Sequence, residues 1–286
     1  MRPWRQCQRG LCYTPENTTL TFYYDSQRDS RPGRIYDLNT GLNRVGWELD
    51  HTCSEVTNAV IDPSFADSRP TTTYAWFYGM NKIDTIIGLE YLNTSEVTIM
   101  NWMFGHSNNL EHIDVSHFNT DKVTSMYAMF GDCEKLKTLD LSNWNTANVT
   151  DMDMMFSFCL ELKTIYVGSG WNTDCVTESE HMFANNFLLV GGKGTAYDAN
   201  HVDANYAHID GGTDNPGYFS EKPAFIRGDV NGDGEVTIGD VTALIDYLLL
   251  GKATGISLEN ADCNGIDGIT IADVTALIDY LLNETW

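Results

Sequence analysis

Twelve consecutive residues near the end of the sequence, 229–240, carry oxygen atoms at the spacing of a calcium-binding loop. An EF-hand-type loop supplies oxygen ligands from positions 1, 3, 5, 7, 9 and 12, with a backbone carbonyl at position 7 and a glycine at position 6 for the sharp turn. Gly234 stands at position 6. The six ligand positions hold Asp229, Asn231, Asp233, Glu235, Thr237 and Asp240. The spacing therefore predicts a calcium site in this loop.

A second loop of the same kind follows at residues 262–273, with one irregularity. Ile266 stands at position 5, where an oxygen ligand is expected, and Asp267 comes one residue late. The candidate ligands of this loop are Asp262, Asn264, Asp267, Thr270 and Asp273. A local bulge could bring the Asp267 carboxylate to the ion, or the loop could lack calcium, and the sequence leaves both possibilities open.

Each loop leads into the same nine-residue segment, residues 241–249 and 274–282. The apolar residues of this segment are three and four positions apart, which predicts a helix with one buried face. In the first copy that face would comprise Val241, Leu244, Ile245, Leu248 and Leu249.

Two loop-helix units without entering helices resemble a type I dockerin, over about residues 227–283. The resemblance implies calcium-dependent binding to a cohesin domain of a partner. It also places partner selection at positions 10 and 11 of each loop, which here are Ile238, Gly239, Ile271 and Ala272.

A different repeat, of about 26 residues, occupies the middle of the chain. Its phenylalanines recur at spacings of 27, 26, 26 and 27 residues, as Phe77, Phe104, Phe130, Phe156 and Phe183. An Asn-Thr-x-x-Val-Thr phrase keeps step with them, beginning at Asn93, Asn119, Asn145 and Asn172. One such repeat cannot bury its own apolar side chains, so successive repeats must stack equivalent residues into columns.

Each repeat is expected to contain a short parallel strand, as at residues 139–141, and one or two short helical turns, as at residues 149–156. The asparagines should bond to backbone groups of the bend. Cys133 and Cys159 share one repeat position and should stack as free thiols. A recurring aromatic could form a sugar-stacking stripe, but a buried ladder is the better interpretation for Tyr91, Phe118, Trp144 and Trp171.

Outward-facing polar residues of the predicted strands form a candidate ligand surface. Its members are Glu111, His112, Asp114, Lys137, Asp140, Lys163 and Tyr166. A solvated sheet face that binds nothing would carry the same kind of residue, because the outer face of a repeat protein must be polar in any case.

The repeats resemble those of BspA-like bacterial surface proteins, over roughly residues 56–220. The phrase Met-x-x-Met-Phe-x-x-Cys-x-x-Leu, present at residues 152–162, carries that likeness. It implies a right-handed leucine-rich-repeat solenoid, and thus an α/β repeat fold with a small all-α calcium-binding dockerin domain. We predict an N-terminal β capping region at 1–55, with strands at residues 20–25 and 33–38, the solenoid at 56–220, a linker at 221–226 and the dockerin at 227–286.

The acidic composition narrows the possible partners. With 40 acidic and 17 basic residues the formal net charge is −23, which disfavours nucleic acid and anionic membrane surfaces. No apolar run approaches the roughly 20 residues of a membrane span. The first twelve residues contain three arginines and no apolar core, so we expect no secretory signal in them.

No catalytic motif stands out, and we predict no enzymatic activity. The expected function is that of a monomeric, secreted or cell-surface adhesion protein. It would bind a host protein or glycan through its repeats and a cohesin through its dockerin. Alternatives are an accessory subunit of a cellulosome-like, polysaccharide-degrading complex and an unrecognised glycoside hydrolase.

Overall fold

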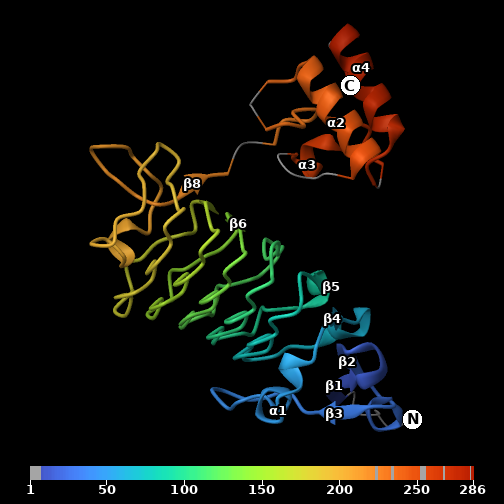
Figure 1. Ribbon diagram of the computed structural model, residues 1–286, viewed down its shortest axis with the longest axis vertical. Coiled ribbons are helices and arrows are strands. Elements are labelled where there is room, and N and C mark those ends of the chain that lie inside the picture. Colours follow the sequence, from blue (N-terminus) through green and yellow to red (C-terminus); the bar gives the residue numbers. More distant parts are fainter. Residues whose placement is uncertain (1–7, 223–224, 233–234, 252–255, 267, 284) are drawn as a thin grey trace, which may run out of the picture. The chain divides into compact units, whose positions relative to one another are not determined.

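The chain divides into two compact units, residues Met1–Lys222 and Pro223–Trp286. The structure, a computed structural model shown in Figure 1, describes residues 8–222, 225–232, 235–251, 256–266, 268–283 and 285–286. The boundary between the units lies inside the segment 221–226. The four domain ranges drawn from the sequence stay predictions.

The N-terminal end of the first unit is a sheet of five strands in the order β3-β1-β2-β4-β5. β1 and β2 form an antiparallel hairpin, β3 pairs antiparallel with β1, and β2, β4 and β5 run parallel. The strands are β1 (Gln8–Thr14), β2 (Thr19–Asp25), β3 (Arg34–Tyr36), β4 (Asn58–Ile61) and β5 (Ile86–Ile87). The strands expected at residues 20–25 and 33–38 are present as β2 and β3, whereas β1 was not predicted.

Short helical turns and large aromatic side chains close this end of the unit. The Trp47 indole donates to the Trp76 carbonyl at 2.9 Å, and the Phe22 ring packs edge-on against Trp47. These three side chains are fully buried, so they seal the first repeat from solvent. The short helices of the unit are α1 (Gly46–Leu49), η1 (Pro15–Asn17), η2 (Arg28–Ser30), η3 (Thr52–Ser54), η4 (Pro63–Asp67), η5 (Leu89–Tyr91) and η6 (Ala204–Tyr206).

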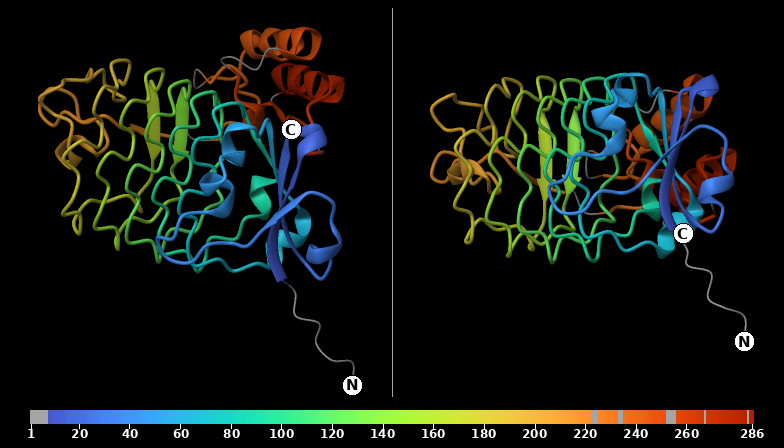
Figure 2. Two further views of the ribbon diagram at one scale, coloured as in Figure 1. Left: turned by 60° about the horizontal axis from the view of Figure 1, so that its bottom comes forward. Right: turned by 90° about the horizontal axis from the view of Figure 1, so that it is seen from below.

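Beyond this end, equivalent residues of successive repeats pair in parallel, and we call residues 71–190 the repeat stack. Bridges join Thr72, Ile99, Ser125, Asp151 and Glu178 in order. Each repeat therefore bonds to the next through its backbone, and Figure 2 shows the repeats side by side. Longer strands occur at β6 (Thr138–Leu141) and β7 (Thr164–Val167), and β8 (Ser220–Glu221) continues their sheet.

The phenylalanines form one buried column, as predicted. Neighbouring rings from Phe77 to Phe183 stack at centroid distances of 5.4, 5.5, 6.0 and 5.6 Å, with interplanar angles of 14° or less. None of the five rings is exposed to solvent. This phenylalanine column is the centre of the core of the first unit.

Polar side chains beside the column bond to the neighbouring repeat. The Cys133 and Cys159 thiols are free, as expected, and donate to the carbonyls of Phe104 and Phe130 at 3.2 and 3.1 Å. Burial raises the pKa of both thiols. They are therefore structural groups and not reactive ones.

The Asn-Thr phrase holds the bend of each repeat through both of its side chains. The Asn145 carboxamide oxygen accepts from the Ala147 amide at 3.1 Å, as predicted. Both side chains also bond between repeats. The buried Thr120 hydroxyl donates to the Asn145 carbonyl at 2.9 Å and accepts from its amide at 2.9 Å, and the Asn145 carboxamide donates to Asp121 at 2.8 Å. The same exchange links Thr94 to Asn119 and Thr146 to Asn172.

The recurring aromatic position is also a core position. Phe118, Trp144 and Trp171 are buried, and Tyr91 is half-buried. The Phe118 and Trp144 rings stack at 6.4 Å, and the Trp144 indole donates to the Val115 carbonyl at 3.0 Å. The buried ladder is confirmed.

The predicted helical turns of the repeats are wrong. In the described residues, 149–156 form a bridge and a hydrogen-bonded turn. Met154 has a φ of 56°, in the left-handed region that a right-handed helix excludes. The amides then bond across repeats, as from Phe130 to the Met155 carbonyl at 3.0 Å. The parallel strand is also less regular than expected, because residues 111–115 between β5 and β6 form no strand.

The second unit contains the helices α2 (Ile238–Leu250), α3 (Leu258–Ala261) and α4 (Ile271–Asn283). Its core is small and contains equivalent residues of the two halves, 33 positions apart. Val241 and Leu244 of α2 are buried together with Val274 and Leu277 of α4. The internal duplication is thus also a structural one.

Candidate functional site

The first predicted calcium loop closes around the carboxylate of Asp240, in the first turn of α2. Its Oδ1 atom accepts from the Asn231 amide at 2.9 Å, and its Oδ2 atom accepts from the Thr237 amide at 2.8 Å. The Thr237 side chain completes a capping box at the helix start. Because Asn231 and Asp240 are nine residues apart, these bonds bring the two ends of the loop together.

The second loop repeats this arrangement at the start of α4. Asp273 accepts from the amides of Asn264 and Thr270 at 3.1 and 2.8 Å. The early turn of the loop is set by two further bonds, from the Gly265 amide to Asp262 at 2.7 Å and from the Ile266 amide to the Asn264 carboxamide at 2.7 Å. Asp233 and Asp267, the position-5 candidates of the two loops, lie outside the described residues.

The donor set of the first loop fits a hard cation. Asp240 is fully buried and Asp229 is 2% exposed, so one short loop holds two buried carboxylates. Burying carboxylates is costly unless a cation or strong donors compensate their charge. Oxygen ligands are those that calcium prefers. Across the described ranges no three or more His, Cys, Asp or Glu side chains gather as a metal site. Asp233 lies outside those ranges, and the remaining candidate ligands of the loop include carbonyl and amide oxygens.

The residues expected to select the partner are all on the surface. Ile238 is 72% exposed and Ile271 is 71% exposed, and Gly239 and Ala272 are exposed beside them. Groups of exposed large apolar side chains usually mark an interaction surface, whereas single ones are common on any protein.

The apolar surface extends further than predicted, to the other end of each helix. Leu249, which we expected in the core, is 75% exposed, as is its equivalent Leu282. Eight residues after Val241, Leu249 lies about 80° around the helix axis from it and next to the helix end, so it leaves the buried face. Ile245 and Leu248 are half-buried. The sequence signal for this surface is the apolar run at residues 248–250, which is too broad for one buried face.

The predicted ligand surface on the repeats is partly paired within the chain. Lys137 bonds to Glu111 at 2.8 Å, and their hydrogen bond lowers the pKa of Glu111 and raises that of Lys137. Asp140 bonds to Lys222 at 3.0 Å, next to β8. Burial alone would raise the pKa of Asp140, but hydrogen bonds from Ser142 and Lys222 lower it overall.

The other members of this surface differ in how accessible they are. Lys163, His112 and Asp114 are exposed, whereas Tyr166 is half-buried in β7 where it pairs with Ser220 of β8. The two ends of the predicted surface are therefore unlike, and the more open end is around His112.

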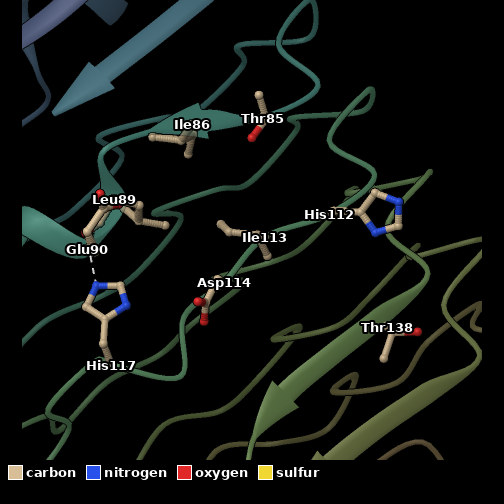
Figure 3. Close-up of a pocket in the computed structure, with 9 residues that line it drawn as sticks. All are labelled: Thr85, Ile86, Leu89, Glu90, His112, Ile113, Asp114, His117 and Thr138. Carbon is tan, nitrogen blue, oxygen red and sulfur yellow. Dashed lines mark hydrogen bonds between the residues drawn. The ribbon is translucent and has the colours of Figure 1, made fainter. Parts of the chain in front are cut away.

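A hollow of about 350 Å³ opens at that end, between the last strand of one sheet and the first strand of the next (Figure 3). His112 and Asp114 lie on the segment between them, with Ile113, and His117 reaches across to the Leu89 carbonyl at 3.0 Å. The residues that line the hollow are Thr85, Ile86, Leu89, Glu90, His112, Ile113, Asp114, His117 and Thr138. Glu90 and His117 also line the hollow and were not among the predicted ligand residues.

Comparisons with known proteins agree with the two regions. Residues 227–282 match the sequence family described as the dockerin type I domain. Residues 71–189 match the family described as Mycoplasma protein of unknown function, DUF285. The resemblances to a type I dockerin and to BspA-like repeats are confirmed. Dockerin domains bind cohesin domains, and type I dockerins generally bind calcium. We call residues 227–282 the dockerin domain.

A solved structure also resembles the chain, a leucine-rich cell surface protein from Faecalibacterium prausnitzii. The identity is 20% and the TM-score is 0.35, over 66% of this chain and 48% of that protein. This chain thus spans about half the length of that protein. No curated protein matches the chain. In the part of the chain that the structure describes, no helix is long and apolar enough to cross a membrane.

Proposed function

We propose that this chain is a non-catalytic, secreted or cell-surface binding protein whose dockerin domain, with calcium bound, docks it to a cohesin-bearing partner. The observation that supports the proposal is the duplicated closure of the two loops. Asp240 and Asp273 are both fully buried, and each ties the start of its own loop to the start of a helix. Calcium in the loop would fix the start of the helix that carries Ile238 or Ile271.

The calcium proposal assigns one ion to the first loop. Its ligands would be Asp229, Asn231, Asp233 and Asp240, with the Glu235 carbonyl and a water held by Thr237. The second loop would use Asp262, Asn264, Thr270 and Asp273, and its occupancy depends on Asp267. The ion would offset the charge of the buried carboxylates and keep the loop closed.

The cohesin would contact the exposed apolar side chains of the two helices. Ile238 and Leu249 of α2 have exact counterparts in Ile271 and Leu282 of α4. Such a surface favours a hydrophobic contact. Because the halves are nearly identical, either α2 or α4 would suit the same partner surface.

A binding assay with the full chain and a panel of purified cohesin domains tests this function. We expect capture by at least one cohesin in calcium and loss of capture in EDTA. The double variant Ile238→Asp with Ile271→Asp should abolish capture, whereas Ile87→Asp, at an isoleucine of the first unit that is 57% exposed, should leave it unchanged. Capture that survives both EDTA and the double variant would contradict the proposal.

For the rest of the chain we propose a right-handed leucine-rich-repeat solenoid that presents a binding face to a host protein or glycan. The parallel bridges and the phenylalanine column support this assignment. The face would comprise Glu111, His112, Asp114, Lys137, Asp140, Lys163 and Tyr166. Labelling of intact cells with an antibody against the chain would test its surface location, and signal only after permeabilisation would refute it.

A further inference from the structure

We propose that the hollow around His112 binds an uncharged carbohydrate through one or two sugar rings. This inference rests on the proposed binding role of the repeat face and gives that face a ligand class. Three observations carry it: an interrupted sheet, uncommitted polar side chains, and a lining that contains carboxylates but no lysine or arginine.

The interruption leaves backbone groups open to a ligand. β5 ends after two residues because Gly88 turns with a φ of 75° and η5 follows. The next strand of the stack is β6, so residues 111–114 lie between two sheets. Within the described chain, their amides and carbonyls bond to no other backbone group. Such groups normally find partners, and here hydroxyl groups of a ligand could provide them.

The side chains around the hollow can both donate and accept hydrogen bonds. In the described structure, the Thr85 and Thr138 hydroxyls and the His112 ring make no hydrogen bond, and Figure 3 shows them spread around the cavity. Asp114 uses Oδ1 for the Ser116 amide and hydroxyl, at 2.9 and 2.6 Å, which leaves Oδ2 available. Ile86, Leu89 and Ile113 provide apolar contact. This mixture of polar and apolar groups matches the edge and face of a pyranose ring.

The charge and hydrogen-bonding groups of the lining disfavour anionic and cationic small ligands. Glu90 and Asp114 would repel a carboxylate, sulfate or phosphate. An ammonium group would suit the two carboxylates, but it has donors only and would leave the amides of residues 111–114 without acceptors. Neutral hydroxyl groups satisfy both kinds of partner.

Titration calorimetry with the full chain in calcium tests the inference. The probes are hexasaccharides of β-1,4-linked glucose, xylose and mannose, with oligogalacturonate as the acidic counterpart. We expect at least one uncharged sugar to bind and oligogalacturonate not to bind. His112→Ala and Thr138→Ala should each weaken binding roughly fivefold to tenfold, the loss of about one hydrogen bond.

Thr164→Ala provides the matched control. Thr164 occupies the same repeat position as Thr138, 26 residues later, but does not line the hollow. It should bind sugar like the unchanged chain. Absence of binding by all three uncharged sugars, equal or stronger binding of oligogalacturonate, or equal affinities for the unchanged chain and His112→Ala would each overturn the inference. Cohesin capture by the same samples would show that the docking function stands independently.

Discussion

In the repeat stack, the recurring threonine hydroxyls and cysteine thiols bond to the backbone of the neighbouring repeat, whereas in the dockerin domain the buried polar groups include carboxylates at the closure of a loop. Thr120 and Cys133 illustrate the first case and Asp240 the second. Both regions arose by internal duplication of sequence. In the stack, each repeat provides hydrogen-bond partners for the polar groups of the next repeat. In the dockerin domain, the duplicated loops bury carboxylates whose charge a bound cation would offset.

The largest expected effect is on the stack alone. Phe130→Ala removes the middle ring of the phenylalanine column and should lower the unfolding free energy of the stack by about 3–5 kcal/mol. Denaturant unfolding, followed by tryptophan fluorescence for the stack and by helical circular dichroism for the dockerin domain, separates the two regions. Phe158→Ala, which truncates a ring that is 41% exposed, should cost much less. Equal losses for both variants would show that the column is not the core.

Calcium removal should destabilise the dockerin domain and not the stack. A free calcium concentration ~100 times the dissociation constant stabilises the domain that binds it by ~2.7 kcal/mol. We expect EDTA to lower the melting temperature of the dockerin domain and to leave that of the stack unchanged in calorimetry. If EDTA shifts neither transition, the calcium assignment is wrong.

A buried carboxylate near the end of the first unit differs from those of the dockerin loops, because hydrogen-bond donors of the protein surround it and it needs no cation. Asp210 accepts from the amides of Lys193, Thr195 and Gly212 at 2.8, 3.0 and 2.8 Å. Burial alone would raise its pKa, but these bonds and the Thr195 hydroxyl lower the pKa far below the usual value. Asp210→Asn should cost about 2 kcal/mol at pH 7, since its NH₂ group cannot accept from these amides.

The pH dependence of that loss follows from the direction of the shift. A lowered pKa in the folded state stabilises the protein fully above the unfolded-state value of about 3.9 and progressively less below it. The difference between the unchanged chain and Asp210→Asn should therefore shrink as the pH falls from 5 toward 2, in urea unfolding at each pH. Asp214→Asn, at an exposed site in the same turn, should show little difference at any pH.

The smallest effect concerns the bonds between repeats. Thr120→Val keeps the shape of the side chain but leaves the Asn145 amide and carbonyl without a partner, which should cost about 1–2 kcal/mol. Thr98→Val removes an exposed hydroxyl whose partner, the Thr71 carbonyl, can turn to water, so its cost should be close to zero. Thermal unfolding of the two variants measures the difference. Equal melting temperatures would place the threonine ladder outside the stabilising contacts.

The features that could be predicted from the sequence are those that the repeat spacing encodes directly. Once the repeats stack, the rings of Phe104 and Phe130 must lie one above the other, and the Asn145 side chain must bond to the backbone of its turn. The predicted helical turns failed because the left-handed backbone of Met154 leaves no trace in the spacing of apolar residues. In the dockerin loops, the spacing placed Asp240 at the closure of the first loop, where the structure has it.

The hollow could not be predicted, because it depends on where the regular pattern stops. Residues 111–115 form no strand. The turn that follows them, from the Phe118 amide to the Val115 carbonyl at 3.1 Å, is nevertheless the same as the turn at Gly88 and in the later repeats. His112 was predicted from its outward position, whereas His117 and Glu90 lie beyond the strand position, and the spacing alone did not place them beside His112. The prediction that Leu249 is buried failed for a related reason, since the spacing of apolar residues does not show where other elements stop packing against a helix.

The short strand β8 has a mechanical consequence. It pairs with β7 immediately before the boundary between the two units, and Lys222 adds an ion pair to Asp140 of β6. Tension on the chain from an anchored dockerin domain would first meet this ion pair and the β7–β8 bonds. Those contacts would bear the force first, so the last repeat of the phenylalanine column would unfold only after they had broken.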